Sequence, residues 1–583
     1  FDSHVHLASR RLSIIDLELG DQPMYDENRT LSIVYNGEVY NFKEIKKDLG
    51  ARGHSFFTNT DTEVVLHAYM EWGEKCLSLF RGMFAFCIWD YAKKELFLAR
   101  DRLGIKPLYY STLADGTFLF SSEIKALMQY PGIEKRMYTK AMDNLLTYGF
   151  NIAPNTFFEG IKQLLPGHYM IVSANGVSDK EYWDIDLDAP LLDEDESAIA
   201  AQLEYVIGKA VGYGHIADVP VAAYLSGGID SSAITGIYSR LSDRKIRTIS
   251  IAFDHADYDE AEYSRQVSSF FDTENIEFTC TVEPEGIEDL IYYLEEPMVT
   301  LLNLPLFLLS GKVRESGFKV VLSGDGADEI LGGYDYFKML KVMRFISRQE
   351  SSFRKNLLRR VMPNVKNFVQ AEIQYMYLKN IPVKYPALPY RFQGFPFKAQ
   401  MYSKEYNEEL DDLPEDDPFF FGLDRITHRS LIDQALYIDT KMRLLNLTLP
   451  LADKMSMANS VELRPLFLDH DLVNFVFRIP DKYKIKVLSE KNILKQSMKG
   501  FLPDSICRRK KQPLQPPGKW FIDSAYDMIR ASLSKQTVVK KGYFNPHFVE
   551  KALVGYDNQS KMDYSGVIIV AFFVHLWDEI FLQ

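Results

Sequence analysis

The chain has 583 residues, of which 46% are hydrophobic and 25% charged, a composition typical of a folded globular protein rather than a disordered or fibrous one. Its length exceeds what a single hydrophobic core usually holds, so we expect at least two domains. The 80 acidic and 67 basic side chains give a net charge of −13, which excludes a general attraction for nucleic acid or anionic lipid.

Cysteine content and hydropathy indicate the environment of the protein. Cys76, Cys87, Cys280 and Cys507 show no CxxC or metal-ligand spacing, which favours reduced thiols and no structural zinc site. No apolar run approaches the roughly 18 to 20 residues that span a bilayer, and no signal-like segment opens the chain. We therefore expect a cytoplasmic protein with no membrane partner and no nucleic-acid partner.

Short strands separated by turn residues dominate about the first 130 residues. Compact apolar or alternating runs predict strands at 31–35, 83–89, 96–99 and 117–121, and residues 61–72 have helical spacing behind a possible Asp/Thr cap. This pattern predicts a strand-rich layered domain. The acidic, proline-containing segment LDAPLLDEDE at 187–196 predicts a linker, which divides the chain into domains at 1–190 and 195–583.

Beyond the linker, strand-length apolar runs alternate with helical patterns. Runs at 219–225, 248–253 and 319–322 each lie near a helix candidate, and this alternation predicts a buried parallel sheet with helices on both faces. From about residue 337 the strands give way to helical patterns. We assign no structure to 337–424, which contains proline and aromatic clusters at 382–397 and 414–421.

The segment SGGIDSS at 226–232 follows the apolar run VPVAAYL and precedes a helical pattern. Glycines let a ligand approach the backbone, and free N–H groups at a helix start point toward anions, so this segment predicts a phosphate cradle. It lacks the GxxxxGK[ST] pattern of a Walker loop. The alternative is a tight turn in which Asp230 or Ser231 is only a helix cap.

A second glycine-acid segment, LSGDGADE at 322–329, follows another apolar strand. Neighbouring parallel strands would bring both acidic loops into one crevice. Asp230 and Asp328 then become candidates to hold Mg²⁺, which prefers oxygen ligands and shares them with substrate phosphates.

The two glycine-acid segments resemble the pyrophosphate loop of the adenylating ATP pyrophosphatases and the LSGxGxDE motif of the asparagine synthetase family. Three further segments resemble that family: DKMSM at 453–457, ELRPLFLD at 462–469 and EKNILK at 490–495. The first two correspond to a helix and turn beside the acceptor. The resemblance implies that Lys491 contacts the reacting phosphate and the developing oxyanion.

The resemblance also implies the other site residues of the synthetase. Catalytic roles fall to Lys491, Asp325 and Glu329, and the metal ligands are Asp230 and Asp328. The contacts to ATP and pyrophosphate are Leu225, Ser226, Gly227, Gly228, Asp230, Ser231, Ser232, Ile251, Ser323 and Gly324.

The first domain resembles the glutaminase half of class II amidotransferases. The resemblance rests on RRLSIID at 10–16, NGE at 36–38, NTDTEV at 59–64 and RDRLGIKPL at 100–108. It implies an αββα Ntn-hydrolase-like fold, truncated at its start, in which glutamine is held by Arg11, Asn36, Gly37, Glu38 and Asp61. Without the family, Asn36 and Gly37 would indicate a hairpin turn and Arg11 a surface ion pair.

The sequence departs from the family at two places. The family's nucleophile is an N-terminal cysteine, whereas this sequence begins Phe1-Asp2-Ser3. We therefore expect no glutamine hydrolysis by the chain as given; either a preceding segment exists or the protein uses free ammonia. In addition, Asp325 stands where asparagine-forming members commonly carry glutamate and lactam-forming relatives carry tyrosine.

These features predict an α/β protein whose truncated glutaminase domain precedes a Rossmann-like parallel-sheet domain with a helical C-terminal half. The implied chemistry is adenylation of an acid, most simply aspartate, followed by attack of ammonia that travels through an apolar passage. The implied small molecules are ATP, Mg²⁺, the acid, and glutamine or ammonia; a homodimer is left open. Two alternatives are amidation of another acid in a secondary-metabolite or envelope pathway, and a non-catalytic nucleotide-binding protein.

Overall fold

The computed structural model describes residues 4–253, 260–280, 286–346, 397–413, 423–487, 489–509, 518–560 and 562–583. Most of the unassigned segment 337–424, including nearly all of both its proline and aromatic clusters, lies outside these residues. The division into domains at 190 and 195 stays a prediction. Below, "N-terminal part" means residues 1–190 and "C-terminal part" means residues 195–583.

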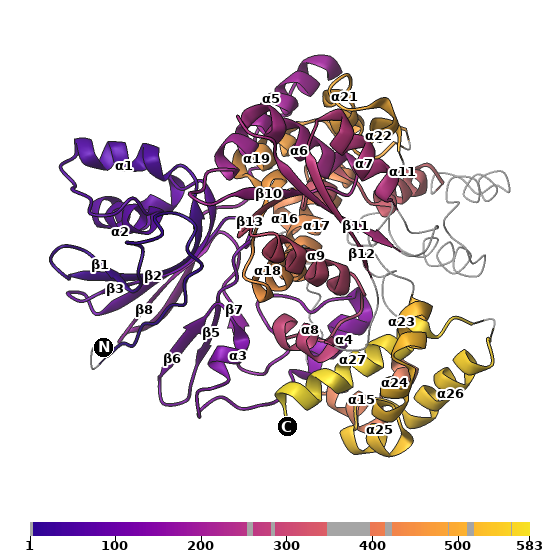
Figure 1. Cartoon of the computed structure of the whole chain (residues 1–583). Helices are drawn as coiled ribbons and strands as arrows, with labels where there is room; N and C mark the ends of the chain where they lie inside the picture. Colours follow the sequence, from indigo (N-terminus) through magenta and orange to yellow (C-terminus); the bar gives the residue numbers. More distant parts are fainter. Residues whose placement is uncertain are drawn as a thin grey trace.

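A six-stranded antiparallel sheet forms the framework of the N-terminal part (Figure 1). Its strand order is β1-β2-β3-β4-β8-β9. The strands are β1 (Met24–Tyr25), β2 (Leu31–Val39), β3 (Gly82–Asp90), β4 (Glu95–Arg100), β8 (His168–Ser173) and β9 (Gly176–Glu181). All the strands predicted for this sheet are confirmed, each with slightly wider bounds.

Successive side chains along each strand of this sheet point to opposite faces, and each face packs against a different layer. Ile33, Phe86 and Phe97 belong to the core formed with α1 (Phe42–Ala51) and α2 (Asp61–Trp72). Val34 and Cys87 belong to a second core, against the small sheet β6-β5-β7. That sheet consists of β5 (Tyr109–Thr112), β6 (Phe118–Ser121) and β7 (Lys162–Gln163), and the short helix α3 (Ile124–Leu127) packs on it. The predicted αββα layering is confirmed.

A five-stranded parallel sheet forms the centre of the C-terminal part. Its order is β12-β11-β10-β13-β14, with β10 (Val221–Tyr224), β11 (Arg247–Phe253), β12 (Glu274–Cys280), β13 (Val320–Ser323) and β14 (Glu462–Pro465). The chain builds outward from β10 to β12 and then returns to place β13 on the other side of β10. The carboxyl ends of β10 and β13 therefore mark the switch point at which such sheets bind ligands.

Helices cover both faces of the parallel sheet, as predicted. Ala223 and Leu322 belong to the core that includes α5 (Glu196–Gly214) and α6 (Ile229–Leu241). Ala222 and Val321 belong to the core of the opposite face, which includes α9 (Asn303–Glu315) and α18 (Leu449–Ala458). The segment 187–195 forms neither helix nor strand before α5 begins.

The sequence analysis does not predict the two edge strands of the parallel sheet. The expectation that strands end by about residue 337 is wrong because β14 occupies Glu462–Pro465, where a turn was expected, whereas the helix expected at 453–457 lies within α18 (Leu449–Ala458). The strand lacks an apolar pattern since Glu462 and Arg464 are both buried, paired through Nε and Oε1 at 2.9 Å. Strand β12 was missed because it is a half-exposed edge with little apolar character.

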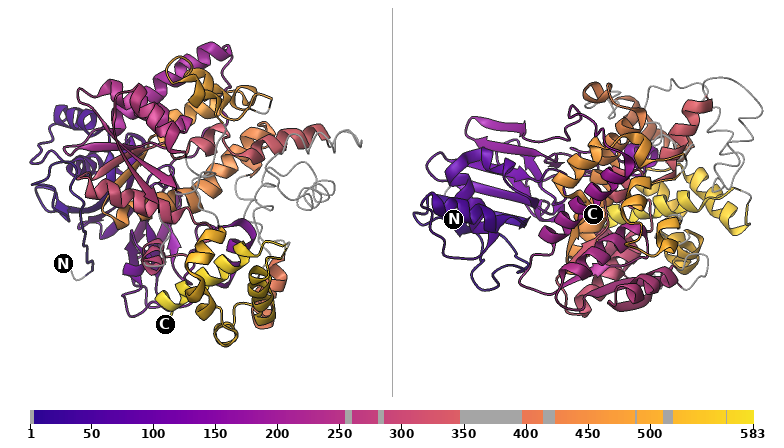
Figure 2. Two further views of the ribbon diagram at one scale, coloured as in Figure 1. Left: turned by 45° about the vertical axis from the view of Figure 1, so that its right-hand side comes forward. Right: turned by 90° about the horizontal axis from the view of Figure 1, so that it is seen from above.

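The remaining helices and turns complete the fold. They are η1 (Gly73–Ser78), α4 (Thr139–Tyr148), α7 (Ala261–Phe270), α8 (Ile287–Leu294), α10 (Ala327–Leu331), α11 (Asp335–Ile346), α14 (Lys398–Met401), α15 (Lys404–Asp411), α16 (Leu423–Ile426), α17 (Leu431–Asp439), the π-helix η4 (Thr440–Thr448), η5 (Leu466–Leu468), α19 (His470–Arg478), α20 (Asp481–Lys484), α21 (Asn492–Ser497), α22 (Asp504–Arg508), α23 (Gly518–Ser524), α24 (Tyr526–Ser532), α25 (Lys535–Lys541), α26 (Pro546–Asp557) and α27 (Ser565–Phe581). Figure 2 shows how the C-terminal helices gather beside the parallel sheet.

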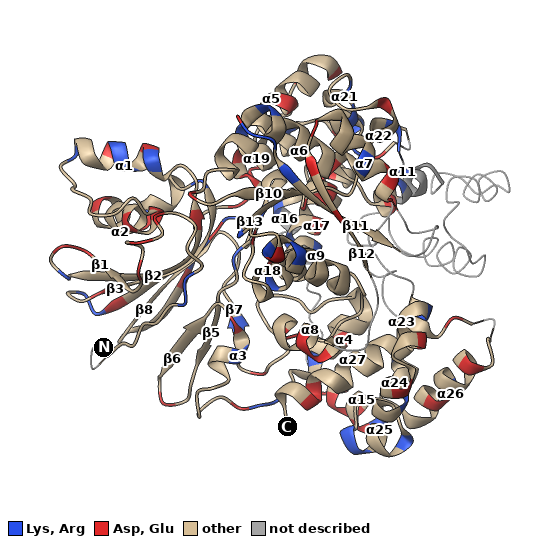
Figure 3. Ribbon diagram, viewed as in Figure 1, with Lys and Arg blue, Asp and Glu red and all other residues tan. Residues whose placement is uncertain are grey.

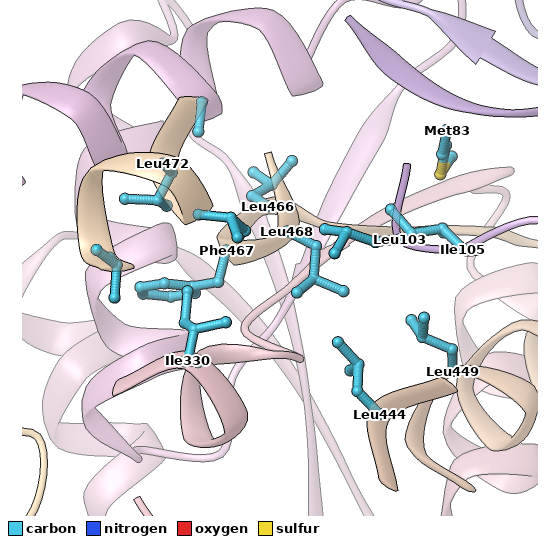
Figure 4. Packing of buried hydrophobic residues seen from close by; sticks show 14 of the residues in the cluster. Met83, Leu103, Ile105, Ile330, Leu444, Leu449, Leu466, Phe467, Leu468 and Leu472 are labelled. Carbon is cyan, nitrogen blue, oxygen red and sulfur yellow. The ribbon is translucent and has the colours of Figure 1, made fainter. Parts of the chain in front are cut away.

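The two parts share one apolar core. Figure 4 shows Leu103 and Ile105 of the N-terminal part beside Leu444, Leu449 and Leu468 of the C-terminal part. Because this cluster runs without interruption from the glutaminase-like sheet to the parallel sheet, the relative position of the two parts is fixed by hydrophobic packing.

The surface carries both charge signs. Figure 3 shows basic and acidic residues interspersed along α1 and α5, in keeping with the modest overall excess of acid. Within the described ranges, none of the helices has the length and apolar character needed to cross a bilayer.

Trp577 on α27 joins the C-terminal helices to the N-terminal part. Its ring is fully buried, 5.0 Å from the ring of Phe158 and 5.7 Å from that of Phe157 between centroids. Its Nε1–H donates to the carbonyl of Glu295 at 3.0 Å, just beyond α8. The aromatic ring and this hydrogen bond would both be lost in an alanine variant.

We expect Trp577→Ala to lower the free energy of unfolding by about 3–5 kcal/mol, because it opens a cavity and leaves a buried carbonyl without its donor. Thermal and urea unfolding would measure the loss. Val554→Ala on α26, where the side chain is 48% exposed, is the control and should change stability little. Equal stability of the two variants would contradict the role given to Trp577.

Candidate functional site

The two predicted loops meet at the switch point of the parallel sheet. One loop follows β10 and leads into α6, and the other follows β13 and leads into α10. A Cβ atom on Gly324 would lie 2.8 Å from Cβ of Asp230 and 2.9 Å from the backbone nitrogen of Ser231. Only glycine permits this approach, so the two loops form one continuous rim.

Short polar contacts shape the first loop. The hydroxyls of Ser226 and Ser231 lie 3.0 Å apart, and the backbone N–H of Gly228 donates to the Ser226 hydroxyl at 3.3 Å. Gly227 has φ +70° and packs against Tyr263. The helix cap is Gly228, so the alternative that Asp230 or Ser231 caps α6 is wrong. No side chain caps the helix, which leaves its first-turn N–H groups facing the loop, as an anion site requires.

The other predicted nucleotide contacts surround this loop. Leu225 and Ser323 are buried at the ends of β10 and β13, and Ile251 is buried near the end of β11. Ser232 is fully buried in the first turn of α6. The loop and the strand ends thus combine exposed backbone with an apolar floor.

Lys491 connects the two loops. Its Nζ lies 2.5 Å from Oδ2 of Asp230 and 2.5 Å from Oδ1 of Asp328, and its side chain is 3% exposed. Burial alone would lower the pKa of Lys491, but the charges of Asp230 and Asp328 outweigh burial and raise it above its ordinary value. The ammonium group is therefore permanently charged at neutral pH.

The backbone presents Lys491 to the site in an uncommon conformation. Lys491 directly precedes α21 and has a φ of +48°. Residues other than glycine, asparagine and aspartate seldom adopt this left-handed backbone conformation. A Cβ on Gly333 would lie 2.3 Å from Cε of Lys491, so a glycine is needed opposite the lysine. Conformational strain of this kind typically persists at sites where function needs it.

Asp325 lies on the rim of the same crevice, partly buried. The hydroxyl of Ser323 donates to its Oδ2 at 2.7 Å. Burial raises the pKa of Asp325 to about 6, and the neighbouring charges of Glu329, Asp328 and Asp230 act in the same direction. The carboxylate is ionised at neutral pH but close enough to its pKa to exchange a proton.

Glu329 points into the protein beneath the loop. It is 1% exposed, and its Oε1 accepts hydrogen bonds from the hydroxyls of Tyr334 and Thr448, each at 2.8 Å. Thr448 ends the π-helix η4, from which Arg443 stacks over the Tyr334 ring at 4.6 Å. In this structure Glu329 organises the floor of the crevice; its predicted catalytic role stays a prediction.

Asp230 and Asp328 are the candidate ligands of the predicted magnesium ion, which stays a prediction. Asp230 and Asp328 approach a common point from two different loops, as their shared contact with Lys491 requires. No cluster of three or more His, Cys, Asp or Glu side chains suited to a metal occurs in the part of the chain that the structure describes. Oxygen atoms from substrate phosphates would have to complete the coordination, which is the usual arrangement for Mg²⁺.

Arg509 is a residue at the site that sequence reasoning missed. Its Nη1 donates to the carbonyl of Ser226 at 3.4 Å, its guanidinium pairs with Glu260, and it stacks 4.3 Å from the centre of the Tyr263 ring. Burial lowers the pKa of Arg509 to about 10. In the sequence Arg509 belongs to the basic run RRKK, a pattern typical of solvent-exposed segments, so the residues around it give no indication of a role at the site.

In the N-terminal part, the predicted glutamine residues Asn36, Gly37 and Glu38 lie on β2 and Asp61 contacts the last residue of that strand, whereas Arg11 contacts the loop that precedes β1. Arg11 donates to the carbonyl of Asp16 at 2.9 Å, and Asn36 donates to the hydroxyl of Ser122 at 3.2 Å. Gly37 has φ +136°, and a Cβ there would lie 2.1 Å from the carbonyl oxygen of Met83. Asn36 and Gly37 therefore lie within a strand rather than in a hairpin turn.

Two buried carboxylates complete this region. Asp61 opens α2 and accepts hydrogen bonds from the hydroxyl of Tyr35 at 2.6 Å and the backbone N–H of Val39 at 2.9 Å. Burial raises the pKa of Glu38 well above its ordinary value, as do the charges of Asp61 and Glu462. Two buried acids within electrostatic reach of each other suit a cationic ligand group.

Comparison with known proteins agrees with this geometry. The glutamine amidotransferase domain matches residues 1–183, and asparagine synthase matches residues 202–579. Asparagine synthetase [glutamine-hydrolyzing] 3 of Bacillus subtilis is 33% identical and aligns over 88% of this chain and 80% of its own length. Asparagine synthetase [glutamine-hydrolyzing] 1 of the same organism is 31% identical, over 91% and 83%.

A relative with another name is also similar. Amidase chry2 of Gibberella zeae is 29% identical and aligns over 98% of this chain and 90% of its own length. All three relatives align across both parts of the chain. Because its C-terminal part is matched almost throughout and these three relatives are each covered over at least 80% of their lengths, the chain belongs to the asparagine synthase family.

Proposed function

We propose that this protein adenylates a carboxylic acid with ATP and converts the acyl-adenylate to an amide with ammonia, which glutamine supplies. The observation that carries the proposal is the contact of one buried lysine, Lys491, with a carboxylate from each of the two ligand loops. Membership of the asparagine synthase family supports an ATP-dependent amide-forming ligase.

The first step activates an unreactive carboxylate. A carboxylate oxygen of the acid attacks the α-phosphorus of ATP, and the bond from that phosphorus to the β-phosphate oxygen breaks. Pyrophosphate leaves against the backbone N–H groups of the loop from Ser226 to Ser232. Mg²⁺ bound by Asp230 and Asp328 would neutralise phosphate charge, and the ammonium of Lys491 stabilises negative charge as it grows.

The second step forms the amide. Ammonia attacks the carbonyl carbon of the adenylate, and the bond to the phosphate oxygen breaks to release AMP. The attacking nitrogen must lose a proton, and the carboxylate of Asp325, held by Ser323, is suited to accept it. Water has to be excluded from the adenylate. A small cavity at the interface of the two parts is our candidate for the ammonia passage; Ile105, Leu449 and Pro450 line it together with the charged side chains of Arg100, Asp453 and Lys454.

The acceptor is aspartate in our first proposal and another carboxylic acid in our second. The two Bacillus subtilis relatives carry the name asparagine synthetase, which favours aspartate. Asp325 is one methylene shorter than the glutamate of asparagine-forming members, and the relative named an amidase aligns with nearly the whole chain, which favours a different acid.

A panel of acids tested with ATP and ammonium chloride would distinguish these acceptors. We expect AMP, pyrophosphate and one amide in equal amounts, and only with the true acceptor. Production of ADP and phosphate, or AMP formation that no acid stimulates, would contradict the proposed chemistry.

Lys491→Ala should lower kcat by about two to three orders of magnitude while the KM for the acceptor changes far less, because the ammonium interacts most strongly with transition-state charge. Lys491→Arg should also fail, since a planar guanidinium cannot replace a compact ammonium between two carboxylates. Steady-state measurement of AMP release would test both variants.

Lys495→Ala is the matched control. Lys495 lies on the next helical turn, where its Nζ pairs with Glu490 at 3.1 Å rather than with either ligand loop. Its alanine variant should retain most activity. A near-normal rate for Lys491→Ala, or greater damage in the control, would remove Lys491 from the mechanism.

Asp325 should give the amide-forming step an acidic limb in its pH profile. Its pKa is raised to about 6, so lowering the pH through 6 protonates the carboxylate and removes the proton acceptor. Measured at a constant concentration of free ammonia, amide formation should fall below pH 6. Asp325→Asn should be slow and lack this limb, whereas Asp325→Glu should retain one. A limb near pH 6 that persists in Asp325→Asn would refute the assignment.

A further inference from the structure

Glu38 of the N-terminal part meets Arg464 of the C-terminal part. The distance from Oε1 of Glu38 to Nη2 of Arg464 is 3.6 Å, and the two side chains are 6% and 0% exposed. Glu38 lies on β2 within the predicted glutamine segment, and Arg464 lies on β14 at the edge of the parallel sheet. The predicted glutamine site and the synthetase sheet are thus in direct electrostatic contact.

The other groups of Arg464 are already engaged. Its Nε pairs with Oε1 of Glu462 at 2.9 Å, and its Nη1 donates to the carbonyls of Gly214 at 2.9 Å and Ile216 at 2.7 Å. These bonds fix the guanidinium against the end of α5. Its Nη2 faces Glu38, and within the described ranges neither Nη2 nor Oε2 of Glu38 has a hydrogen-bond partner.

The charges around Glu38 come from three parts of the chain. Asp61 on α2 and Glu462 on β14 oppose its ionisation; Arg464 on β14 and Lys106, beyond β4, favour it. Lys106 is committed to Asp453, at 2.9 Å from Nζ to Oδ1. The rings of Tyr35 and Tyr40 add no fixed charge. Arg464 is therefore the cation best placed to oppose burial and the neighbouring acids and to favour ionisation of Glu38.

We propose that Arg464 is a positioning residue of the glutamine site: its guanidinium favours the charged form of Glu38, the form that binds the ammonium group of glutamine. This inference rests on the assignment of Glu38 to glutamine in the proposed function. It means that the C-terminal part completes a site built mainly by the N-terminal part.

The register of β13 and β14 connects Arg464 to the nucleotide crevice as well. Arg464 lies opposite Leu322 in the β13–β14 ladder. Leu322 is the residue before Ser323, where the second ligand loop begins. One strand pair therefore carries both the residue that favours ionisation of Glu38 and the start of the loop that holds Asp325. The glutamine site and the nucleotide crevice share this strand pair as a common support.

Glutamine binding measured by calorimetry across pH tests the proposal without any catalytic step. Arg464→Gln removes the cation, so Glu38 ionises only at higher pH. The pH range over which glutamine affinity rises (the rising limb) should therefore shift to higher pH, and at a fixed pH within that range the affinity should be about tenfold weaker. Arg464→Lys keeps the charge and should shift the limb less. Glu462→Gln removes an opposing charge and should move the limb to lower pH.

The two Gln variants should shift the pH dependence of glutamine binding in opposite directions, whereas structural damage would weaken binding in both. If Arg464→Gln does not fold, Glu462→Gln still tests the proposal by its downward shift. Arg81→Lys is the control, since the Arg81 side chain forms another buried pair between the two parts, with Asp469 at 2.6 Å, rather than with Glu38; its profile should match that of the unmodified protein. Unshifted limbs, or shifts of the same sign in both Gln variants, would overturn the proposal. AMP formation with ammonium chloride, measured in parallel, reports separately on the proposed adenylation.

Discussion

The arrangement of the site depends on one buried ion cluster, in which Lys491 lies 2.5 Å from a carboxylate of each ligand loop. Two aspartates from adjacent loops would repel each other without a cation between them. A buried lysine would in turn lose its charge without its two carboxylates. Each member thus stabilises the charged form of the others, and the cluster fixes the separation of the loops. Phosphates of a bound nucleotide would meet a rim whose charges are already in place.

Burial of charge also joins the two parts of the protein. The shared apolar core supplies most of the contact, while ion pairs such as Lys106 with Asp453 and Arg81 with Asp469 cross the same boundary. Removing one member of such a pair leaves an uncompensated buried charge, which is costly. These pairs therefore specify one register of the two parts more strongly than apolar contact alone, and a passage for ammonia would need that fixed register.

The sequence predicted those elements in which local pattern and burial agree. The central strands β10, β11 and β13 are apolar runs beside glycine-rich loops, and structure confirmed them. The edge strands β12 and β14 were missed because one is half-exposed and the other buries Glu462 and Arg464. No local pattern could reveal contacts that only the fold creates, such as that of Lys491 with both aspartates, of Arg509 with Ser226, or of Glu38 with Arg464. Family resemblance predicted Lys491 and Glu38 as site residues, but their partners are set by packing.

The central claim is that the acid is activated as an adenylate, and transfer of an isotope tests it most directly. The protein would be incubated with ATP, ammonium chloride and the acceptor acid labelled with oxygen-18 in its carboxylate. Attack of the carboxylate on the α-phosphorus followed by release of AMP leaves one labelled oxygen in AMP. Mass spectrometry should therefore find the label in AMP and none in pyrophosphate. Label in inorganic phosphate, accompanied by ADP, would show an acyl phosphate instead and contradict the account.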